Sequence, residues 1–248
     1  MIYLLEPDGL EALAALWPEL TEADQVYQTR HWQPRLDTVP VRQAGYNPEI
    51  AAAVLARWQR VLRAEGLHRL ALAAASEDPE VYNYLAVFIR ACRRDGPALF
   101  NYMQRKEVYP LRCLEREVQR EVHRFLGLLR FSCSKEGVYY APYEPEHDIS
   151  RFIAPHFAGR MGEARFIIHD LRREKAVLYE QGQLRLQPLP RTFSDFWQAE
   201  DASFVRAWQR YYQQAAVTNR LNPQLRRKNM PKKYWAYLSE LWGAAPDA

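Results

Sequence analysis

The spacing of apolar residues changes near Gly127, and this change constrains the fold more than any other feature of the chain. Upstream, apolar residues recur at three- and four-residue steps, which predicts amphipathic helices. The clearest example is the stripe Leu111, Leu114, Val118, Val122, Phe125 and Leu129. Downstream, alternating apolar residues and glycine-containing turns predict strands, as in residues 128–143. The chain is therefore predicted to be α+β.

The predicted N-terminal half is mainly helical. It opens with a short strand, a turn at Pro7–Gly9 and a helix that begins near Leu10. A long helix follows, with Asn47 as its N-cap and Gly66 as its end. Residues 24–47, between these two helices, show no regular spacing and are expected to be irregular.

The second half is predicted to hold a small antiparallel sheet, built from a strand pair, a helix and further strands. The helix spans 148–161, with Asp148 as its cap. The last strands form a hairpin that turns at Gln181–Gly182. From residue 193 onward the spacing becomes helical again, and we expect these C-terminal helices to pack back on the core.

Chain length and apolar content favour one compact domain. The 248 residues, 48% of them hydrophobic, are enough to bury a sizeable core. No linker-like tract separates independent parts, so we expect a single domain over 1–248. Within it, a helical part over 1–126 would precede a part over 127–248 that holds the sheet and the C-terminal helices.

Several classes of protein are excluded by what the chain lacks. Its start does not resemble a signal peptide and no run of about 20 apolar residues occurs, so we expect a cytoplasmic protein that does not cross a membrane. The three cysteines are scattered, which is not typical of a disulfide framework, a zinc ribbon or an iron–sulfur cluster. Glycine-rich phosphate loops, nucleophile elbows and dinucleotide fingerprints are also missing, and no cofactor is expected.

Positive charge is concentrated near the C-terminus. The net charge is only +4, yet residues 202–239 contain no acid at all. The bases in that window are Arg206, Arg210, Arg220, Arg226, Arg227, Lys228, Lys232 and Lys233. Because local potential attracts and holds anions, the window favours contact with a polyanion, with a solvated basic surface as the alternative. In its densest part, NPQLRRKNMPKKYW, we expect Tyr234 and Trp235 to be buried.

Further bases lie on the predicted sheet and on the helix before it. The charged stripe of that helix is interpreted as a solvated face with salt bridges, formed by Arg112, Glu115, Arg116, Glu117, Arg120, Glu121 and His123. Arg130 stands in an otherwise apolar strand and needs a carboxylate or phosphate partner. Arg160, Arg172 and Arg173 are expected at one edge of the sheet, where guanidinium groups can bind phosphates or carboxylates in bidentate fashion.

Histidines suggest a second, catalytic interpretation of the same region. His156, His169 and Asp170 are candidates for general acid–base catalysis beside phosphate-binding arginines, with Asp148 and His123 as further members. His169 and Asp170 are adjacent on a strand, so their side chains point to opposite faces. For His156 the alternative is a hydrogen-bonded histidine in the core. A metal site built from His156, His169, Asp148 and Asp170 is geometrically allowed, but the spacing does not require it.

A string of motifs in the second half resembles a bacterial protein family. In chain order the motifs are HRFLGLLRF, GVYYAPYEPEHDI, APHFAGRM, FIIHDLRREKAVLY and TNRLNPQLRRKNMPKKYWAYLSE. They resemble a family assigned to DNA metabolism or DNA repair, over about His123 to Glu240. Members of that family are encoded beside a radical SAM protein, and some are fused to a family-4-type uracil-DNA glycosylase. Near the start, this chain keeps only Asp8–Gly9 of the family's longer Tyr-Asp-Gly-Ser-Phe-Glu-Gly motif.

The resemblance implies a biological setting rather than a reaction. The leading hypothesis is an accessory protein that holds nucleic acid, DNA above all, near a repair enzyme, with the radical SAM protein and a uracil-DNA glycosylase as partners. The bases expected to contact nucleic acid are Arg124, Arg130, Arg160, Arg172, Arg173, Arg220, Arg226, Arg227, Lys228, Lys232 and Lys233. A hydrolase or base-processing enzyme centred on His156, His169 and Asp170 is the first alternative. A protein adaptor without nucleic-acid contact is the second.

Overall fold

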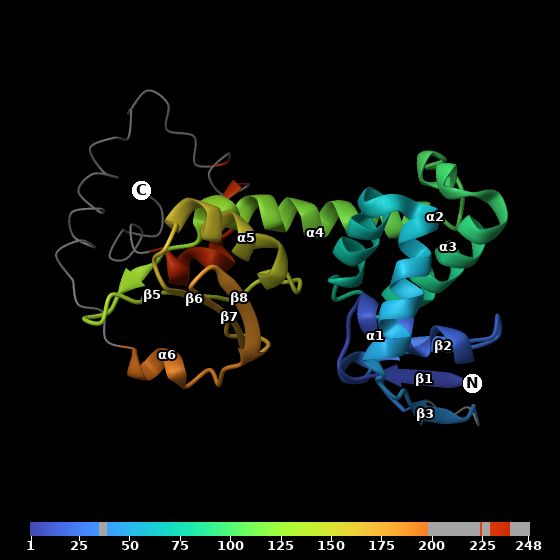
Figure 1. Cartoon of the computed structure of the whole chain (residues 1–248), viewed down its shortest axis with the longest axis horizontal. Coiled ribbons are helices and arrows are strands. Elements are labelled where there is room, and N and C mark those ends of the chain that lie inside the picture. Colours follow the sequence, from blue (N-terminus) through green and yellow to red (C-terminus); the bar gives the residue numbers. More distant parts are fainter. Residues whose placement is uncertain (35–38, 198–223, 225–228, 239–248) are drawn as a thin grey trace. The chain divides into compact units, whose positions relative to one another are not determined.

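The computed structural model describes residues 1–34, 39–197, 224 and 229–238 (Figure 1). The chain divides into two compact units, Met1–Arg120 and Glu121–Ala248. Its class is α+β: a helical first unit also holds a small parallel sheet, and the second unit is built on a five-stranded mixed sheet. No helix in these ranges is both long and apolar enough to cross a membrane. The single domain expected over 1–248 stays a prediction.

The first unit contains a parallel sheet with the strand order β2–β1–β3. Its strands are β1 (Ile2–Leu5), β2 (Gln25–Gln28) and β3 (Val41–Gln43). Helix α1 (Leu10–Leu16) follows β1 as predicted. The expectation that residues 24–47 are irregular is wrong, because β2 and β3 lie there. Their sequence signal is weak since both strands are short and every residue of β3 is exposed.

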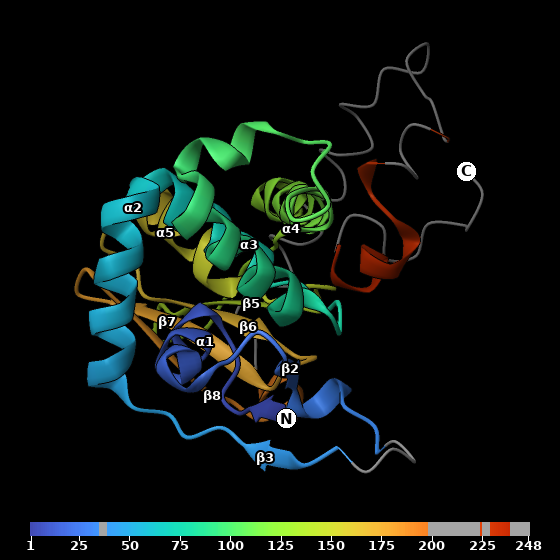
Figure 2. The same cartoon turned by 90° about the vertical axis from the view of Figure 1, so that its right-hand side faces the viewer.

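Three further helices belong wholly or partly to the first unit: α2 (Pro48–Ala74), α3 (Val81–Asp95) and α4 (Tyr109–Leu128), which runs past the boundary at Arg120. Figure 2 shows α1 and α2 side by side, with β3 at the edge of the sheet. Short 3₁₀ helices connect these elements: η1 (Trp17–Glu19), η2 (Thr29–His31) and η3 (Pro97–Asn101).

Both predicted ends of α2 can be compared with the structure. Asn47 caps the helix as predicted, since its Oδ1 accepts hydrogen bonds from the backbone N–H groups of Glu49 (2.9 Å) and Ile50 (3.1 Å). The prediction that the helix ends at Gly66 is wrong. That glycine is a close-packing position, because an added Cβ would lie 3.1 Å from a ring carbon of Phe100.

The main apolar core of the first unit collects residues from β1, β2, the helices α1, α2 and α3 and the start of α4. Its fully buried members include Leu13, Leu70, Leu85 and Phe88. Helix α2 is broken at Arg63, which has a φ of 61° and a ψ of 174°. Residues with a side chain rarely adopt such a positive φ.

The sheet of the second unit has the strand order β4–β5–β6–β7–β8. The strands are β4 (Ser132–Cys133), β5 (Tyr139–Tyr143), β6 (Phe166–Asp170), β7 (Lys175–Glu180) and β8 (Gln183–Pro188). Most neighbours are antiparallel, as predicted, but β5 and β6 are parallel, so the sheet is mixed. The reason is α5 (Ser150–Met161), a crossover helix that returns the chain to the end of the sheet where β5 begins.

Local turn chemistry made the last hairpin predictable. Strands β7 and β8 are joined by Gln181 and Gly182, and Glu180 is paired with Gln183 across the turn. Both turn residues have a positive φ, 51° and 77°. That combination is typical of a two-residue type I′ turn, which matches the twist of the flanking strands. The predicted hairpin is therefore confirmed.

Helices lie on opposite faces of the five-stranded sheet (Figure 1). On the α5 face, the Phe131 ring packs between Phe157 and Phe166, with centroid distances of 5.2 Å and 5.9 Å. On the other face, α6 (Phe193–Phe196) presents Phe193 to Tyr140, with ring centroids 5.5 Å apart.

The last described element is the 3₁₀ helix η5 (Lys232–Tyr237). Its Tyr234 is 1% exposed, as predicted, and its ring lies 4.7 Å from that of Phe125 on α4. Trp235 is half-buried. The other helices expected in the C-terminal region lie outside the described residues, apart from α6.

Candidate functional site

Several of the predicted site residues lie around the loop between β5 and α5. Its residues 144–149, EPEHDI, contain three acids, and we call this segment the acidic loop. Each acid forms an ion pair with a base from a different element: Glu144 with Arg191, Glu146 with Lys233, and Asp148 with Lys175. The prediction that Asp148 caps α5 is wrong, because the N-cap residue is Ile149 and no side chain forms a cap hydrogen bond.

Glu121 of α4 anchors the acidic loop from inside the second unit. One carboxylate oxygen accepts hydrogen bonds from the backbone N–H of Glu146 (2.8 Å) and from the Tyr234 hydroxyl (2.6 Å). The other accepts from the backbone N–H of His147 (2.8 Å). These donors compensate for removing the carboxylate from water, since Glu121 is 2% exposed. The interpretation of its stripe as a solvated face is wrong at this position and at the buried Glu115, although Glu115 forms the expected salt bridge with Arg112.

Asp170 organises the turn that follows β6. One of its oxygens accepts hydrogen bonds from the backbone N–H groups of Arg172 (3.0 Å) and Arg173 (3.2 Å). The other accepts from the Arg173 guanidinium at 2.8 Å. Burial raises the pKa of Asp170, and the Arg173 charge opposes that shift. Both arginines also donate to the backbone carbonyl of Glu146, at 3.2 Å and 2.6 Å, so the turn is tied to the acidic loop.

We call seven bases the cation cluster: six that interact with the acidic loop, namely Arg124, Arg172, Arg173, Lys175, Arg191 and Lys233, together with Lys232, the exposed neighbour of Lys233 in the sequence. The hydrogen bond from Lys233 holds the pKa of Glu146 below its ordinary value, and the charges of His147 and Arg124 add to this shift. Lys232 lies over the Trp235 ring, 5.8 Å from its centroid.

Much of this positive charge is neutralised locally. The acids among the cluster are Glu121, Glu144, Glu146, Asp148, Asp170 and Glu174. Arg173 is 7% exposed beside the fully buried Asp170 carboxylate. Arg172, by contrast, is exposed and its side chain donates to a neutral carbonyl, so its charge is retained. Within the described part of the chain, Arg124 and Lys232 are also without a carboxylate partner. These three bases are the ones best able to attract an outside anion.

Two other predicted nucleic-acid contacts lie elsewhere. Arg130 follows the end of α4 instead of standing in a strand, and its guanidinium donates to the carbonyls of Gly127 (2.7 Å) and Leu129 (3.3 Å). These helix-end carbonyls are partners that the sequence did not predict, and an anionic partner for Arg130 stays a prediction. Arg160 is exposed in the last turn of α5. The remaining predicted contacts lie outside the described residues: Arg220, Arg226, Arg227 and Lys228.

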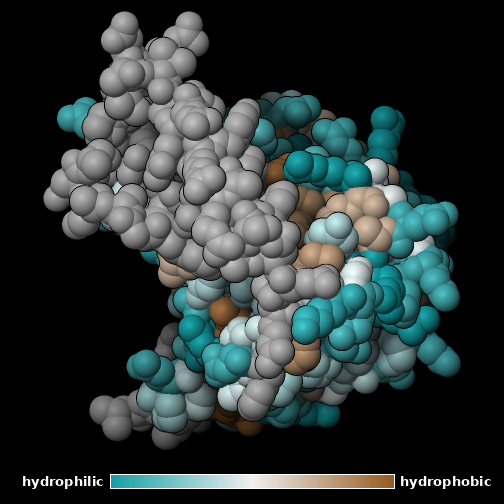
Figure 3. Space-filling model, turned by 90° about the vertical axis from the view of Figure 1, so that its left-hand side faces the viewer, coloured by the Kyte–Doolittle hydropathy of each residue, from teal (hydrophilic) through white to brown (hydrophobic). Residues whose placement is uncertain are grey.

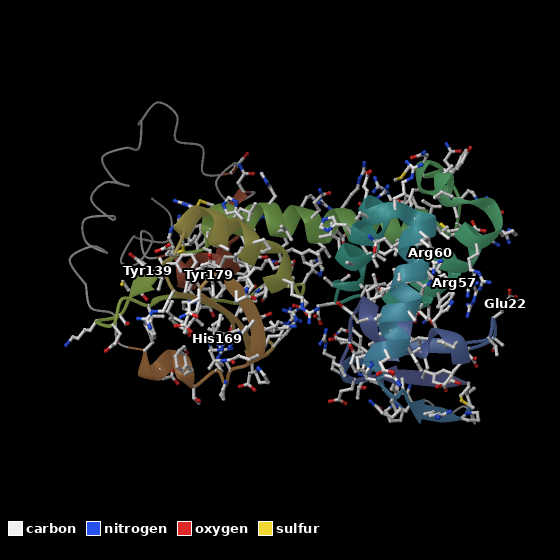
Figure 4. All side chains as sticks on the ribbon, in the orientation of Figure 1. Glu22, Arg57, Arg60, Tyr139, His169 and Tyr179 are labelled. Atoms are coloured by element: carbon white, nitrogen blue, oxygen red, sulfur yellow. The ribbon has the colours of Figure 1, made fainter. Side chains whose placement is uncertain are left out.

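His169 lies on β6 (Figure 4) and is fully buried, with hydrogen bonds on both ring nitrogens. Its Nε2 lies 3.0 Å from the carbonyl oxygen of Leu189, which can only accept, so Nε2 carries the proton. Nδ1 then accepts from the Tyr140 hydroxyl at 2.7 Å. Burial lowers the pKa of His169 and favours the neutral ring. This geometry favours a structural role, and catalysis by His169 stays a prediction.

His156 and His169 do not share a site. His156 is exposed on α5, so the expectation that it lies in the core is wrong. His169 points to the opposite face of the sheet, where Phe193 of α6 contacts it with ring centroids 6.2 Å apart. Across the described ranges, no group of three or more His, Cys, Asp or Glu residues is arranged to hold a metal ion. The metal site drawn from both histidines therefore does not form.

The Asp8–Gly9 pair lies in the first unit, where it shapes the turn between β1 and α1. Gly9 has a φ of 121°, which favours glycine, and its N–H donates to the buried Tyr82 hydroxyl at 2.6 Å. Asp8 pairs with Arg30 at 2.8 Å, and the same guanidinium pairs with Glu77 at 2.8 Å. Asp8 and Gly9 thus connect the turn after β1 to α3, through Tyr82, and to the segment before α3, through Arg30 and Glu77.

A hollow of about 270 Å³ opens on the sheet of the second unit, apart from the cation cluster. Its lining includes Ile167, Leu178, Arg165, Glu180 and Arg185. In the view of Figure 3, the coloured surface is largely hydrophilic, with apolar residues exposed between the polar ones. Because this hollow mixes both signs of charge with apolar side chains, we do not assign it to the candidate site.

A family profile described as DUF4130, a domain of unknown function, matches residues 79–240. A search of curated proteins found no significant match. The matched region contains every residue of the acidic loop and of the cation cluster. Because the match covers well over half of the chain, the protein belongs to the DUF4130 family.

Proposed function

We propose that this protein is a nucleic-acid-binding accessory protein of DNA repair or DNA metabolism, and that the cation cluster contacts the nucleic-acid backbone. One observation carries the proposal: bases from α4, the β6–β7 turn, β7, the segment after β8 and η5 gather around a single loop. A surface that collects cations in this way attracts phosphates. The acid-free sequence 202–239 adds further bases to the same half of the chain.

The biological setting of the proposal comes from the motif resemblance. Members of the similar family are encoded beside a radical SAM protein, and some are fused to a uracil-DNA glycosylase, so we propose both as partners. Because the three cysteines of the chain are scattered, iron–sulfur chemistry in this proposal belongs to the radical SAM partner. The chain itself would hold the nucleic acid near that partner.

The individual bases of the cation cluster should contribute unequally to nucleic-acid binding. Arg173 is occupied by Asp170 and serves to position the turn. Lys233 is shared with Glu146, whose side chain is 54% exposed. Arg124, Arg172 and Lys232 form no ion pair with a carboxylate among the described residues, so we expect them to make the main phosphate contacts.

The first experiment measures DNA affinity as a function of salt. Fluorescence anisotropy with short single- and double-stranded DNA should give an affinity that falls steeply with salt. Arg172→Ala and Lys232→Ala should each weaken binding and reduce the salt slope by about 1. Arg185→Ala, an exposed arginine on β8 outside the cluster, is the matched control and should bind like the wild type. Equal affinity at low and high salt, or cluster variants that match the control, would refute the proposal.

The second experiment uses the acid at the centre of the cluster. Glu146→Gln releases Lys233 from its ion pair and should tighten DNA binding, by up to about fivefold if the exposed pair is worth no more than about 1 kcal/mol. Glu163→Gln changes the charge equally at an exposed position after α5 and should have a smaller effect. Weaker DNA binding by Glu146→Gln than by Glu163→Gln would contradict the proposed contact.

A protein adaptor would give a different result. In that case the chain would bind no DNA at low salt, yet would co-purify with the radical SAM protein in high salt after nuclease treatment. This outcome would replace nucleic-acid binding with protein binding as the function of the basic surface.

A further inference from the structure

A second hollow, of about 210 Å³, opens in the first unit among η1, α2 and α3. Its walls are mainly apolar and aromatic: Trp17 comes from η1, Trp58 and Leu62 from α2, and Ile89 from α3. The two indole rings meet edge to face, with centroids 5.2 Å apart and planes at 86°. Trp58 is 4% exposed and forms the floor against which Trp17 packs, whereas the half-buried Trp17 supplies most of the aromatic surface that is open to a ligand.

Two arginines complete the lining of this hollow. They are Arg57 from α2 and Arg93 from α3, and among the residues the structure describes neither is paired with a carboxylate. The neighbouring Asp95 is occupied by Arg94 (2.8 Å) and Arg105 (2.6 Å). Guanidinium groups in this position favour an anionic group at the mouth of the hollow, because they can bind it in bidentate fashion.

Other features of the hollow favour binding over thiol chemistry. Cys92 lines it, but burial raises the pKa of this thiol to about 12, so it is a poor nucleophile near neutral pH.

Arg90 supports the wall of the hollow: its guanidinium lies 5.5 Å from the Trp17 ring centroid and donates to the carbonyl of Thr21 at 2.6 Å. The break in α2 at Arg63 directly follows Leu62, and backbone conformations of this kind concentrate at ligand sites.

We propose that this hollow binds one nucleotide, with the base against Trp17 and Trp58 and the phosphate on Arg57 and Arg93. Aromatic walls accept any nucleobase because every base has a π face. The volume of the hollow, about 210 Å³, limits the size of the ligand. Sites for drug-sized molecules have volumes of roughly 300–1,000 Å³. One base therefore fits this hollow, whereas a dinucleotide cofactor does not. The inference is independent of the cation cluster in the second unit.

Calorimetric titration of the full chain with AMP tests this site. Arg57→Ala and Arg93→Ala should each weaken AMP binding at least about tenfold, because each removes a charged partner of the phosphate. Arg60→Ala is the matched control: Arg60 lies on α2 near Arg57 and is exposed, but it does not line the hollow (Figure 4). It should retain the wild-type affinity. Adenosine, which lacks the phosphate, should bind more weakly than AMP and should not distinguish Arg57→Ala from the wild type.

Two further measurements separate this site from others. Arg172→Ala, in the cation cluster, should leave AMP binding unchanged, so the two proposals can fail independently. Competition with a d(A)₄ oligonucleotide identifies the source of the base: displacement of AMP indicates a base within a strand, and no displacement indicates a free nucleotide. Absence of AMP binding at about 5 mM, a very weak affinity, would overturn the proposal. So would unchanged affinity in Arg57→Ala and Arg93→Ala proteins whose circular dichroism matches the wild type.

Discussion

Glu121, His169 and Asp170 show how single buried polar residues hold the second unit together. Each is at most 2% exposed. Glu121 is hydrogen-bonded to the acidic loop, His169 to the segment after β8, and Asp170 to the turn that follows its own strand. A buried polar group without a partner would destabilise the fold, so these bonds determine where the acidic loop, the segment after β8 and the β6–β7 turn can lie. The His-Asp pair in the motif FIIHDLRR thus has a structural role, and a catalytic role for it stays a prediction.

We expect His169 to make the protein less stable in mild acid. Its pKa in the folded chain lies below the ordinary value of 6.5, because burial disfavours the charged ring. The unfolded chain therefore binds a proton at this position at a higher pH than the folded chain does. This residue leaves stability unchanged well above pH 6.5 and lowers it as pH falls below that value, by at most about 1.4 kcal/mol per pH unit.

Urea denaturation at a series of pH values measures this effect. His169→Gln keeps an N–H donor for the Leu189 carbonyl but does not titrate in this range, so its stability should decline less between about pH 6.5 and pH 5. His156→Gln, at an exposed position, should follow the wild type. Identical pH slopes for the wild type and His169→Gln would show that His169 does not titrate as proposed.

At the scale of elements, the end of α4 depends on Arg130. The guanidinium donates to carbonyls in the last turn, which have no partner within the helix, and its charge is favourable at that end of the helix dipole. Arg130→Ala should lower the free energy of unfolding by about 0.5–1.5 kcal/mol, the range of a typical hydrogen bond. Chemical denaturation is the measurement.

The same variant separates structural from binding roles. Because Arg130 serves the helix end, Arg130→Ala should retain the DNA affinity of the wild type. Arg160→Ala, in the exposed last turn of α5, is the control for stability and should change it by less than about 0.5 kcal/mol. A loss of DNA affinity in Arg130→Ala as large as that in Arg172→Ala would instead assign Arg130 to the interface.

At the scale of the whole molecule, we expect the two units to differ in their response to a core substitution. Leu85 is fully buried in the core of the first unit. Leu85→Ala should destabilise that unit by about 2–5 kcal/mol through lost burial and a cavity. Hydrogen exchange should show faster exchange in α1, α2 and α3, while amides of β6 and β7 keep their protection.

Val87→Ala is the matched control for this prediction. Val87 lies on the same helix but is 46% exposed, so its truncation should leave exchange almost unchanged in both units. A uniform loss of protection across both units in Leu85→Ala would show that the chain unfolds as one cooperative domain, as the single-domain prediction over 1–248 implies.

The sequence by itself determined those features that depend on neighbouring residues. The helical spacing before Gly127, the Asn47 cap and the Gln181–Gly182 turn were all predictable, because each depends on a few consecutive side chains. The gathering of Arg172 and Lys233 at one surface was expected from composition, although their common partner was not.

Only the tertiary structure decided which partner each charged or small residue has. The sequence predicts a helix end at Gly66, whereas the structure places this glycine against Phe100, a residue distant in sequence. For Arg130 the sequence predicts an anionic partner but gives no sign of the carbonyls of Gly127 and Leu129 that it also contacts, because these become available only where α4 ends. Likewise, the pairing of Glu146 with Lys233 and the parallel arrangement of β5 and β6 depend on how the chain returns through α5 and η5. Contacts between residues far apart in the chain leave no local pattern, so only the folded chain shows them.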